Sequence, residues 1–279
     1  MGVMGTLLLA TTLAGVAGTG IGGLIGALLQ KDSSRMVSLL LSFAGGVMLS
    51  VVCFDLVTEA IETTVGIYTV IGSVAFGVLI TFFLNWLIDR FANPEVAHID
   101  ENHPKTADHL NELIHSDHLE HHANQKDGSF GLFVAGIVMA CAIALHNIPE
   151  GMTIGASYAS NDAVLGSAAL LLAVLIGLHN IPEGMAVSVP LISGGMGKVK
   201  AVLITAASGI PTILGALLGF ALGEIGPLGL ALSLGFASGA MLYVVFGEIL
   251  PQSILMYHSK LPAFSTIVGI LVGLLVIFG

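Results

Sequence analysis

Eight apolar segments, each roughly 20 residues long or longer, constrain this chain more than any other feature. The hydrocarbon core of a bilayer is about 30 Å thick, and an α-helix needs about 20 residues to cross it. Because 55% of the residues are hydrophobic and only 9% are charged, the composition excludes a soluble globular domain. The sequence predicts an all-α polytopic membrane protein, one domain over residues 1–279, with helices near 4–29, 36–62, 65–90, 130–158, 163–191, 199–223, 226–251 and 262–279.

The basic residues predict how these helices are oriented. All eight lie in or beside alternate connections: Lys31, Arg35, Arg90, Lys105, Lys126, Lys198, Lys200 and Lys260. Since cytoplasmic loops of membrane proteins are enriched in Lys and Arg, we expect these connections to be cytoplasmic and both termini to be extracytoplasmic. The expected location is the plasma (inner) membrane, with the lipid bilayer as a partner. The net charge of −10 leaves no basic patch, so nucleic acid is excluded as a partner.

An internal repeat links the two ends of the chain. Residues 43–55 read FAGGVMLSVVCFD and residues 236–248 read FASGAMLYVVFGE, 193 residues apart. The first and sixth predicted helices also match, with residues 26–29 aligned to residues 215–218, 189 residues apart. The two copies run in opposite directions through the membrane. Such an inverted repeat is typical of secondary transporters and predicts a substrate site near the midplane.

The hexapeptide HNIPEG occurs twice, at residues 146–151 and 179–184, near the middle of the fourth and fifth predicted helices. Within each copy the His and the Glu are four residues apart and share a helix face. An ionisable side chain at mid-bilayer costs about 2.5 to 3.5 kcal/mol even on the most lenient scale, so such groups usually bind or conduct something. Imidazole nitrogen and carboxylate oxygen suit Zn²⁺, and also Fe²⁺, Mn²⁺ or Co²⁺, whereas Mg²⁺ and Ca²⁺ prefer oxygen alone. The sequence therefore predicts a transition-metal site formed by His146, Glu150, His179 and Glu183.

Three further groups have two interpretations each. Asp55 and Glu59 near the outer end of the second helix, and Glu248 near the inner end of the seventh, are candidate residues of a cation pathway or are solvated helix ends. Residues 92–129 hold seven of the ten histidines, and this His-rich loop is a cytoplasmic metal-binding segment or a disordered linker. Its candidate ligands are His115, His118, His121 and His122. Cys53 and Cys141 are interpreted as small buried hydrophobes and not as thiolate ligands.

The doubled HNIPEG motif, the eight helices and the His-rich loop together resemble the ZIP family of divalent-metal transporters, in its bacterial GufA-like or ZupT-like form. The resemblance covers essentially the whole chain and implies a 3+2+3 arrangement of helices. It implies that metal is held between the fourth and fifth helices, that Met48 joins this site, and that the first, fourth, fifth and sixth helices move as a bundle against the others.

The resemblance also implies a second, adjacent metal site that uses Asn147, Asn180, the shared Glu183 and a glutamate on the sixth helix. This chain departs from that pattern, because Thr212 stands where the glutamate is expected. We therefore expect one tightly held intramembrane ion.

These observations predict a transporter that moves divalent transition metal into the cytoplasm by alternating access, with Zn²⁺ as the first choice of substrate and Fe²⁺, Mn²⁺, Co²⁺ or Cd²⁺ as alternatives. The metal is cargo, and no cofactor is expected. A metal-selective channel is the main alternative. An intramembrane metalloenzyme is the other, but it would use His-Glu-x-x-His, whereas here Asn follows each His. The chain could also form a homodimer, and the sequence does not decide this.

Overall fold

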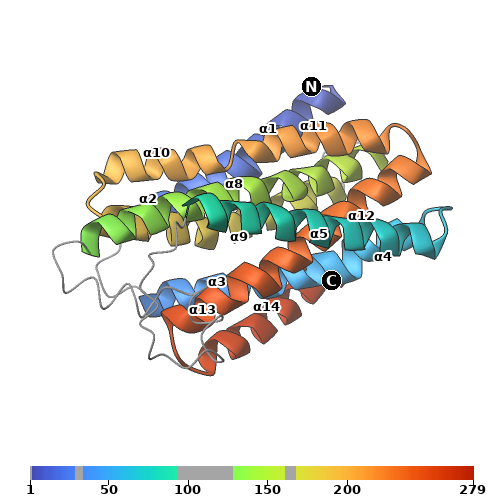
Figure 1. Ribbon diagram of the computed structural model, residues 1–279. Coiled ribbons are helices and arrows are strands. Elements are labelled where there is room, and N and C mark those ends of the chain that lie inside the picture. Colours follow the sequence, from blue (N-terminus) through green and yellow to red (C-terminus); the bar gives the residue numbers. More distant parts are fainter. Residues whose placement is uncertain (1, 29–33, 93–127, 161–167) are drawn as a thin grey trace.

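A computed structural model describes residues 2–28, 34–92, 128–160 and 168–279, and all regular secondary structure in these residues is helical (Figure 1). Eight helical spans are long and apolar enough to cross a membrane, which confirms the predicted fold class. They are Val3–Leu28, Arg35–Glu62, Ile67–Leu87, Gly136–Ala159, Ala169–Ser193, Lys198–Gly223, Pro227–Ile254 and Leu261–Phe278. The predicted boundaries agree with these spans to within a few residues, except at the start of the fourth and fifth helices.

Four of the spans are interrupted, and the other four are single helices. The interrupted spans are α1–η1–α2 (Val3–Thr12, Leu13–Ala17, Gly18–Leu28), α3–η2–α4 (Ser34–Ser50, Val51–Leu56, Val57–Glu62), α10–α11 (Lys198–Ser208, Pro211–Gly223) and α12–η3–α13 (Pro227–Val244, Val245–Ile249, Leu250–Met256). The single helices are α5 (Ile67–Ala92), α8 (Gly128–Ser160), α9 (Ala168–Ser193) and α14 (Leu261–Phe278). The segments η1, η2 and η3 are π-helical.

The spans pack into two bundles. In the first bundle α2 packs against α9, α11 against α8, and α8 against α9; in the second, α14 packs against α3 and α12 against α5. The bundles meet along a seam where α8 and α9 face α3, α5 and α12. This agrees with the division of the helices that the family resemblance implies. The 3+2+3 grouping along the chain stays a prediction.

Glycines allow backbone-to-backbone contact within each bundle. A Cβ on Gly215 of α11 would lie 2.0 Å from the Ile148 carbonyl of α8, and a Cβ on Gly22 of α2 would lie 2.0 Å from the Ile181 carbonyl of α9. In the second bundle, a Cβ on Gly46 of α3 would lie 2.0 Å from the carbonyl oxygen of Thr266 in α14. Only glycine permits such close approach, a packing mode common in membrane proteins.

These contacts correct the register of the internal repeat. Gly22 lies on Ile181 as Gly215 lies on Ile148, and these pairs relate the first and sixth spans by 193 residues and not by 189. The shorter offset came from glycines repeated every four residues, which match equally well one helical turn away. The second and seventh spans keep the predicted offset of 193, and π-helical turns occur at corresponding places, Val51–Leu56 and Val245–Ile249.

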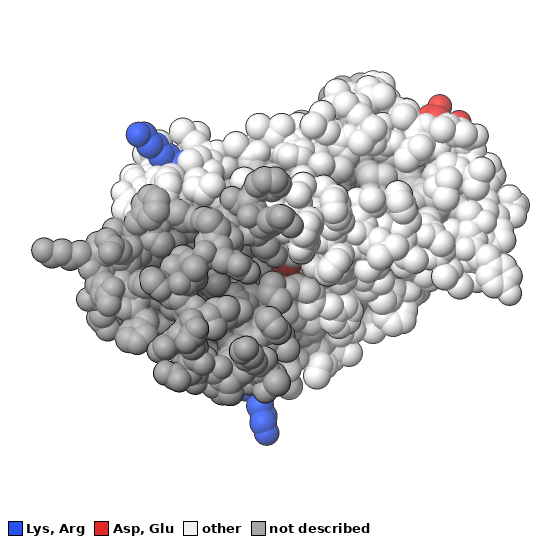
Figure 2. Space-filling view, in the orientation of Figure 1, with Lys and Arg blue, Asp and Glu red and all other residues white. Residues whose placement is uncertain are grey.

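Charge is distributed unequally between the two ends of the molecule. Arg35, Lys198, Lys200 and Lys260 are exposed at the end that holds the α9–α10 and α13–α14 turns, whereas Glu62 and Glu224 are exposed at the other. Figure 2 shows one basic side chain at the upper left and another at the lower edge, with acidic atoms at the upper right. The prediction that the two cysteines are buried is wrong, because both are exposed. An apolar side chain on a membrane helix can face lipid as readily as a core.

Candidate intramembrane metal site

The two HNIPEG motifs meet inside the first bundle. The first lies on α8 and the second on α9, and these helices pack against each other in opposite directions. His146, Glu150, His179 and Glu183 are between 0% and 4% exposed. The structure therefore brings the four predicted ligands into one buried cluster.

Glu150 is at the centre of this cluster. Its Oε1 lies 3.0 Å from Nε2 of His146 and 2.7 Å from Nε2 of His179. His146 Nε2 also lies 3.3 Å from Oε1 of Glu183. One ligand atom from each of His146, Glu150 and Glu183 lies within 4.8 Å of the others, while His179 joins through Glu150. Two imidazoles and two carboxylates at these distances can close around a single divalent cation.

Several donor and acceptor atoms of the cluster have no hydrogen-bond partner. They are both ring nitrogens of His146, Nδ1 of His179, Oε2 of Glu150 and both carboxylate oxygens of Glu183. A buried polar atom without a partner is rare and costly, because desolvation is not compensated. The unpaired carboxylate oxygens are available as ligand atoms for a cation.

The two motif prolines lie inside continuous helices. Pro149 in α8 and Pro182 in α9 have no N–H to donate to the carbonyls of Leu145 and Leu178. A cavity of about 70 Å³ is lined by Leu145, His146 and Pro149 together with residues of α5 and α12. The freed carbonyl lies next to a cavity large enough for a few water molecules.

The motif asparagines have their amide nitrogens anchored to backbone. Asn147 Nδ2 donates to the carbonyl of Ser208 (2.9 Å), and Asn180 Nδ2 donates to the carbonyl of Ala14 (3.0 Å). Both asparagines are fully buried, and both Oδ1 atoms have no partner. If the asparagines are metal ligands, as the family resemblance implies, only Oδ1 of each is available to bind the ion.

Thr212 lies in the same bundle and also has an unpaired oxygen. It is fully buried, and Gly15 of η1 passes so close that a Cβ there would lie 2.4 Å from Thr212 Oγ1. Its repeat equivalent, Thr19, donates to the Gly15 carbonyl at 2.8 Å. Thr212 has no such bond, and the carbonyl four residues before it, that of Ser208, accepts from Asn147.

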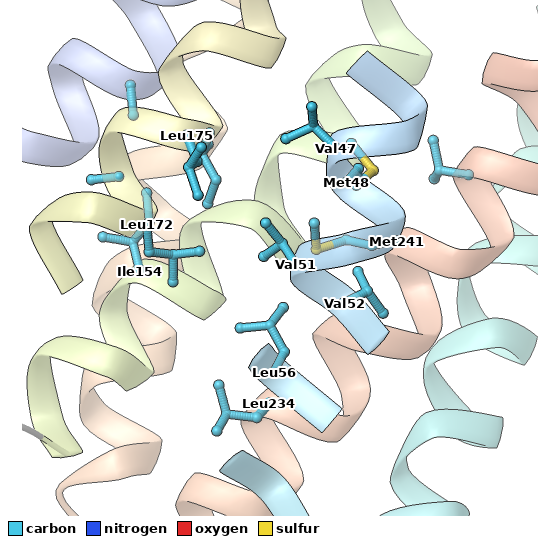
Figure 3. Close-up of a cluster of buried hydrophobic side chains, with 14 of the residues drawn as sticks. Val47, Met48, Val51, Val52, Leu56, Ile154, Leu172, Leu175, Leu234 and Met241 are labelled. Atoms are coloured by element: carbon cyan, nitrogen blue, oxygen red, sulfur yellow. The ribbon is translucent and has the colours of Figure 1, made fainter. Parts of the chain in front are cut away.

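Met48 lies on the opposite side of the seam from the HNIPEG helices. It is fully buried in a cluster of apolar side chains that come from α3 with η2, α8, α9 and α12 (Figure 3). Met241, the repeat equivalent of Met48, belongs to the same cluster and is also fully buried. Sequence reasoning missed Met241, although the aligned stretches AGGVML and ASGAML contained the signal.

The side chains of this cluster that Figure 3 labels fill the seam on one side of the candidate ligands. On α8, Ile154 lies one turn beyond Glu150 toward the end nearest the termini, and on α9 Leu172 and Leu175 lie on the same side. A second cavity, of about 20 Å³, lies on the other side and is lined by His146, Glu183 and Glu248 among others. Neither cavity is lined by the apolar side chains labelled in Figure 3, which fill the seam on the side that we predict to be extracytoplasmic.

The candidate pathway residues lie beside the apolar cluster and beside the cavities. Asp55 in η2 and Glu59 in α4 are half-buried, and they alternate along the chain with Leu56 and Ala60 of the apolar cluster. Glu248 in η3 is half-buried and lines both cavities, and Gln252, which sequence reasoning missed, lines the smaller one. The loop histidines His115, His118, His121 and His122 lie outside the described residues.

Comparison with known proteins identifies the family. The family model described as "ZIP Zinc transporter" matches residues 2–279. The zinc transporter ZupT of Akkermansia muciniphila is 31% identical over 96% of this chain and 93% of its own length. ZupT of Clostridium perfringens is 33% identical over 95% and 92%, and the zinc transporter ZIPB of Bordetella bronchiseptica is 31% identical over 93% and 75%. With a family model matched from end to end and eight apolar spans, this multi-pass membrane protein belongs to the ZIP zinc-transporter family.

Proposed function

We propose that this protein carries Zn²⁺ into the cytoplasm, and that His146, Glu150, His179 and Glu183 hold the ion at mid-membrane. The buried cluster with its unpaired carboxylate oxygens is the observation that carries the proposal. The relatives, which are named zinc transporters, support zinc as the substrate. Fe²⁺, Mn²⁺, Co²⁺ and Cd²⁺ share enough ligand chemistry to be competing substrates.

The arrangement of the two bundles favours alternating access as the transport mechanism. The ligands lie on α8 and α9 of the first bundle, and the apolar cluster blocks the seam on one side of them. Opening that side requires the first bundle to move relative to α3 and α12 of the second. A channel would need a path that is continuous on both sides at once. Asp55 and Glu59 would then attract cations at one mouth, and Glu248 would receive the ion on the other side.

The orientation follows from the charge distribution. The exposed lysines and arginine of the described residues lie at the end toward which the smaller cavity points. Cytoplasmic ends carry the excess of Lys and Arg, so the closed side is extracytoplasmic and both termini lie there. The plasma membrane is the proposed location.

Uptake by proteoliposomes tests the site. His179→Ala and Glu183→Gln each remove one ligand and should lower Zn²⁺ uptake by about tenfold or more, since losing even an outer-shell partner costs 10- to 100-fold in metal affinity. His258→Ala and Glu224→Gln make the same changes at exposed positions and should leave uptake unchanged. Near-normal uptake by both ligand variants would refute the site, and flux that fails to saturate with Zn²⁺ would favour the channel.

A further inference from the structure

Each motif asparagine bonds to a main-chain carbonyl that a helix interruption has released. In the sixth span Pro211 has no N–H, and the N–H of Thr212 bonds to Gly209 and not to Ser208. The Ser208 carbonyl would therefore lack its helical donor, and Asn147 supplies one at 2.9 Å.

The first span repeats this arrangement at its π-helical turn. The Gly18 N–H, which would bond to the Ala14 carbonyl in a regular α-helix, bonds to the carbonyls of Leu13 and Gly15. Asn180 donates to Ala14 at 3.0 Å, and the Cβ atom of Asn180 packs against Gly18. The same solution thus occurs at two interruptions of different geometry, one in each half of the inverted repeat.

We infer that Asn147 and Asn180 are positioning residues, which tie the metal-binding helices to the interrupted turns of the sixth and first spans. Each asparagine directly follows a ligand histidine, so each bond fixes the depth and rotation of His146 or His179. Both bonds lie within the first bundle and make its interrupted spans move with the ligands. This inference rests on the proposed function, because it takes the histidines as ligands, but the hydrogen bonds can be tested without metal.

Hydrogen exchange in nanodiscs, with chelator present, tests the tethers. Asn147→Asp and Asn147→Leu both remove the amide donor, and each should raise exchange of the Gly209, Ile210 and Thr212 amides roughly tenfold or more, the effect of a lost buried hydrogen bond. Asn180→Asp and Asn180→Leu should do the same at Gly18. The Asn147 variants and the Asn180 variants are controls for each other, because each asparagine should affect exchange only at the turn to which it bonds.

Zinc binding by the same variants separates a tether from a ligand. If the asparagines position the histidines, Asp and Leu weaken Zn²⁺ binding alike, because both lose the donor. If the asparagines are ligands through Oδ1, Asp tightens binding, Leu weakens it, and exchange at the two turns does not change. That second pattern would overturn the inference, as would exchange that rises equally in all helices. The ligand variants His179→Ala and Glu183→Gln test the proposed function independently, since they leave both tethers in place.

Discussion

At the scale of single residues, Glu150 contacts both motif histidines, and the two motif asparagines bond to main-chain carbonyls of distant spans. The spacing of His146, Glu150, His179 and Glu183 predicted four side chains on facing helices, and the structure places them within contact of one another. No pattern in the sequence indicated that Glu150 would bridge both histidines, or that Asn147 and Asn180 would bond to carbonyls in distant spans. Those partners depend on which helices pack together.

Thr212 carries a prediction at this scale. Two divalent ions only about 4 Å apart would repel each other by roughly 16 kcal/mol at an effective dielectric constant of 20, before a bridging ligand compensates. Without a carboxylate at position 212, the unpaired oxygens of Thr212 and the asparagines are neutral. We expect the protein that lacks residues 98–124 but keeps Thr212 to hold one tightly bound Zn²⁺. The same protein with Thr212→Glu should hold two, as measured by metal counting at equal Zn²⁺ concentrations.

Thr212→Val is the control for that experiment, because it keeps the volume of the side chain and removes only the hydroxyl. It should bind one ion, as the wild type does. Two well-occupied ions in the wild type would show that neutral oxygens suffice for a second site.

At the scale of helices, the length of the apolar segments predicted the eight spans, and the repeat that relates the second and seventh spans could be recognised in the sequence. The register of the first and sixth was not, because a glycine every fourth residue permits matches one turn apart. The π-helical turns were not predictable either, since a single extra residue in a turn leaves the pattern of apolar side chains almost unchanged.

Glycine contacts give a prediction for element packing. Gly215→Ala puts a methyl group about where the Ile148 carbonyl lies, so it should lower the free energy of unfolding by about 1 to 3 kcal/mol, the usual cost of overpacking. Gly72→Ala changes a helical glycine with nothing within 4 Å and should be neutral or slightly stabilising. Both effects appear as shifts in melting temperature, which can be measured in detergent by monitoring the loss of soluble protein on heating. Equal melting temperatures would contradict the packing described here.

At the scale of the whole molecule, the charge distribution and the inverted repeat predicted the topology, whereas the division into two bundles came from family resemblance. The structure adds which face of each bundle forms the seam and on which side of the proposed ligands the apolar side chains labelled in Figure 3 fill it. A sequence cannot report that closure, because the same side chains must also allow the seam to open.

The His-rich loop gives a prediction at this scale. Deleting residues 98–124 and bridging the gap with Gly-Ser should leave substantial Zn²⁺ uptake, because the four proposed ligands and both bundles lie outside the loop. The response of uptake to metal on the cytoplasmic side should change if the histidines bind it. Uptake by cells or proteoliposomes at varied internal Zn²⁺ measures both effects, and complete loss of flux from well-inserted protein would mean that the loop is part of the transport machinery.

The close glycine contacts described above have a consequence for motion. They lie within the bundles, apart from Gly229, which packs on Leu222 at the turn that joins α11 to α12. A glycine seated on a carbonyl has one position along its neighbour, so helices joined in this way cannot slip without losing the contact. Side chains facing each other across the seam can change rotamer and find new neighbours. The molecule therefore has stiff halves and one compliant plane, and an ion bound by the proposed ligands would change the side it faces without changing those ligands.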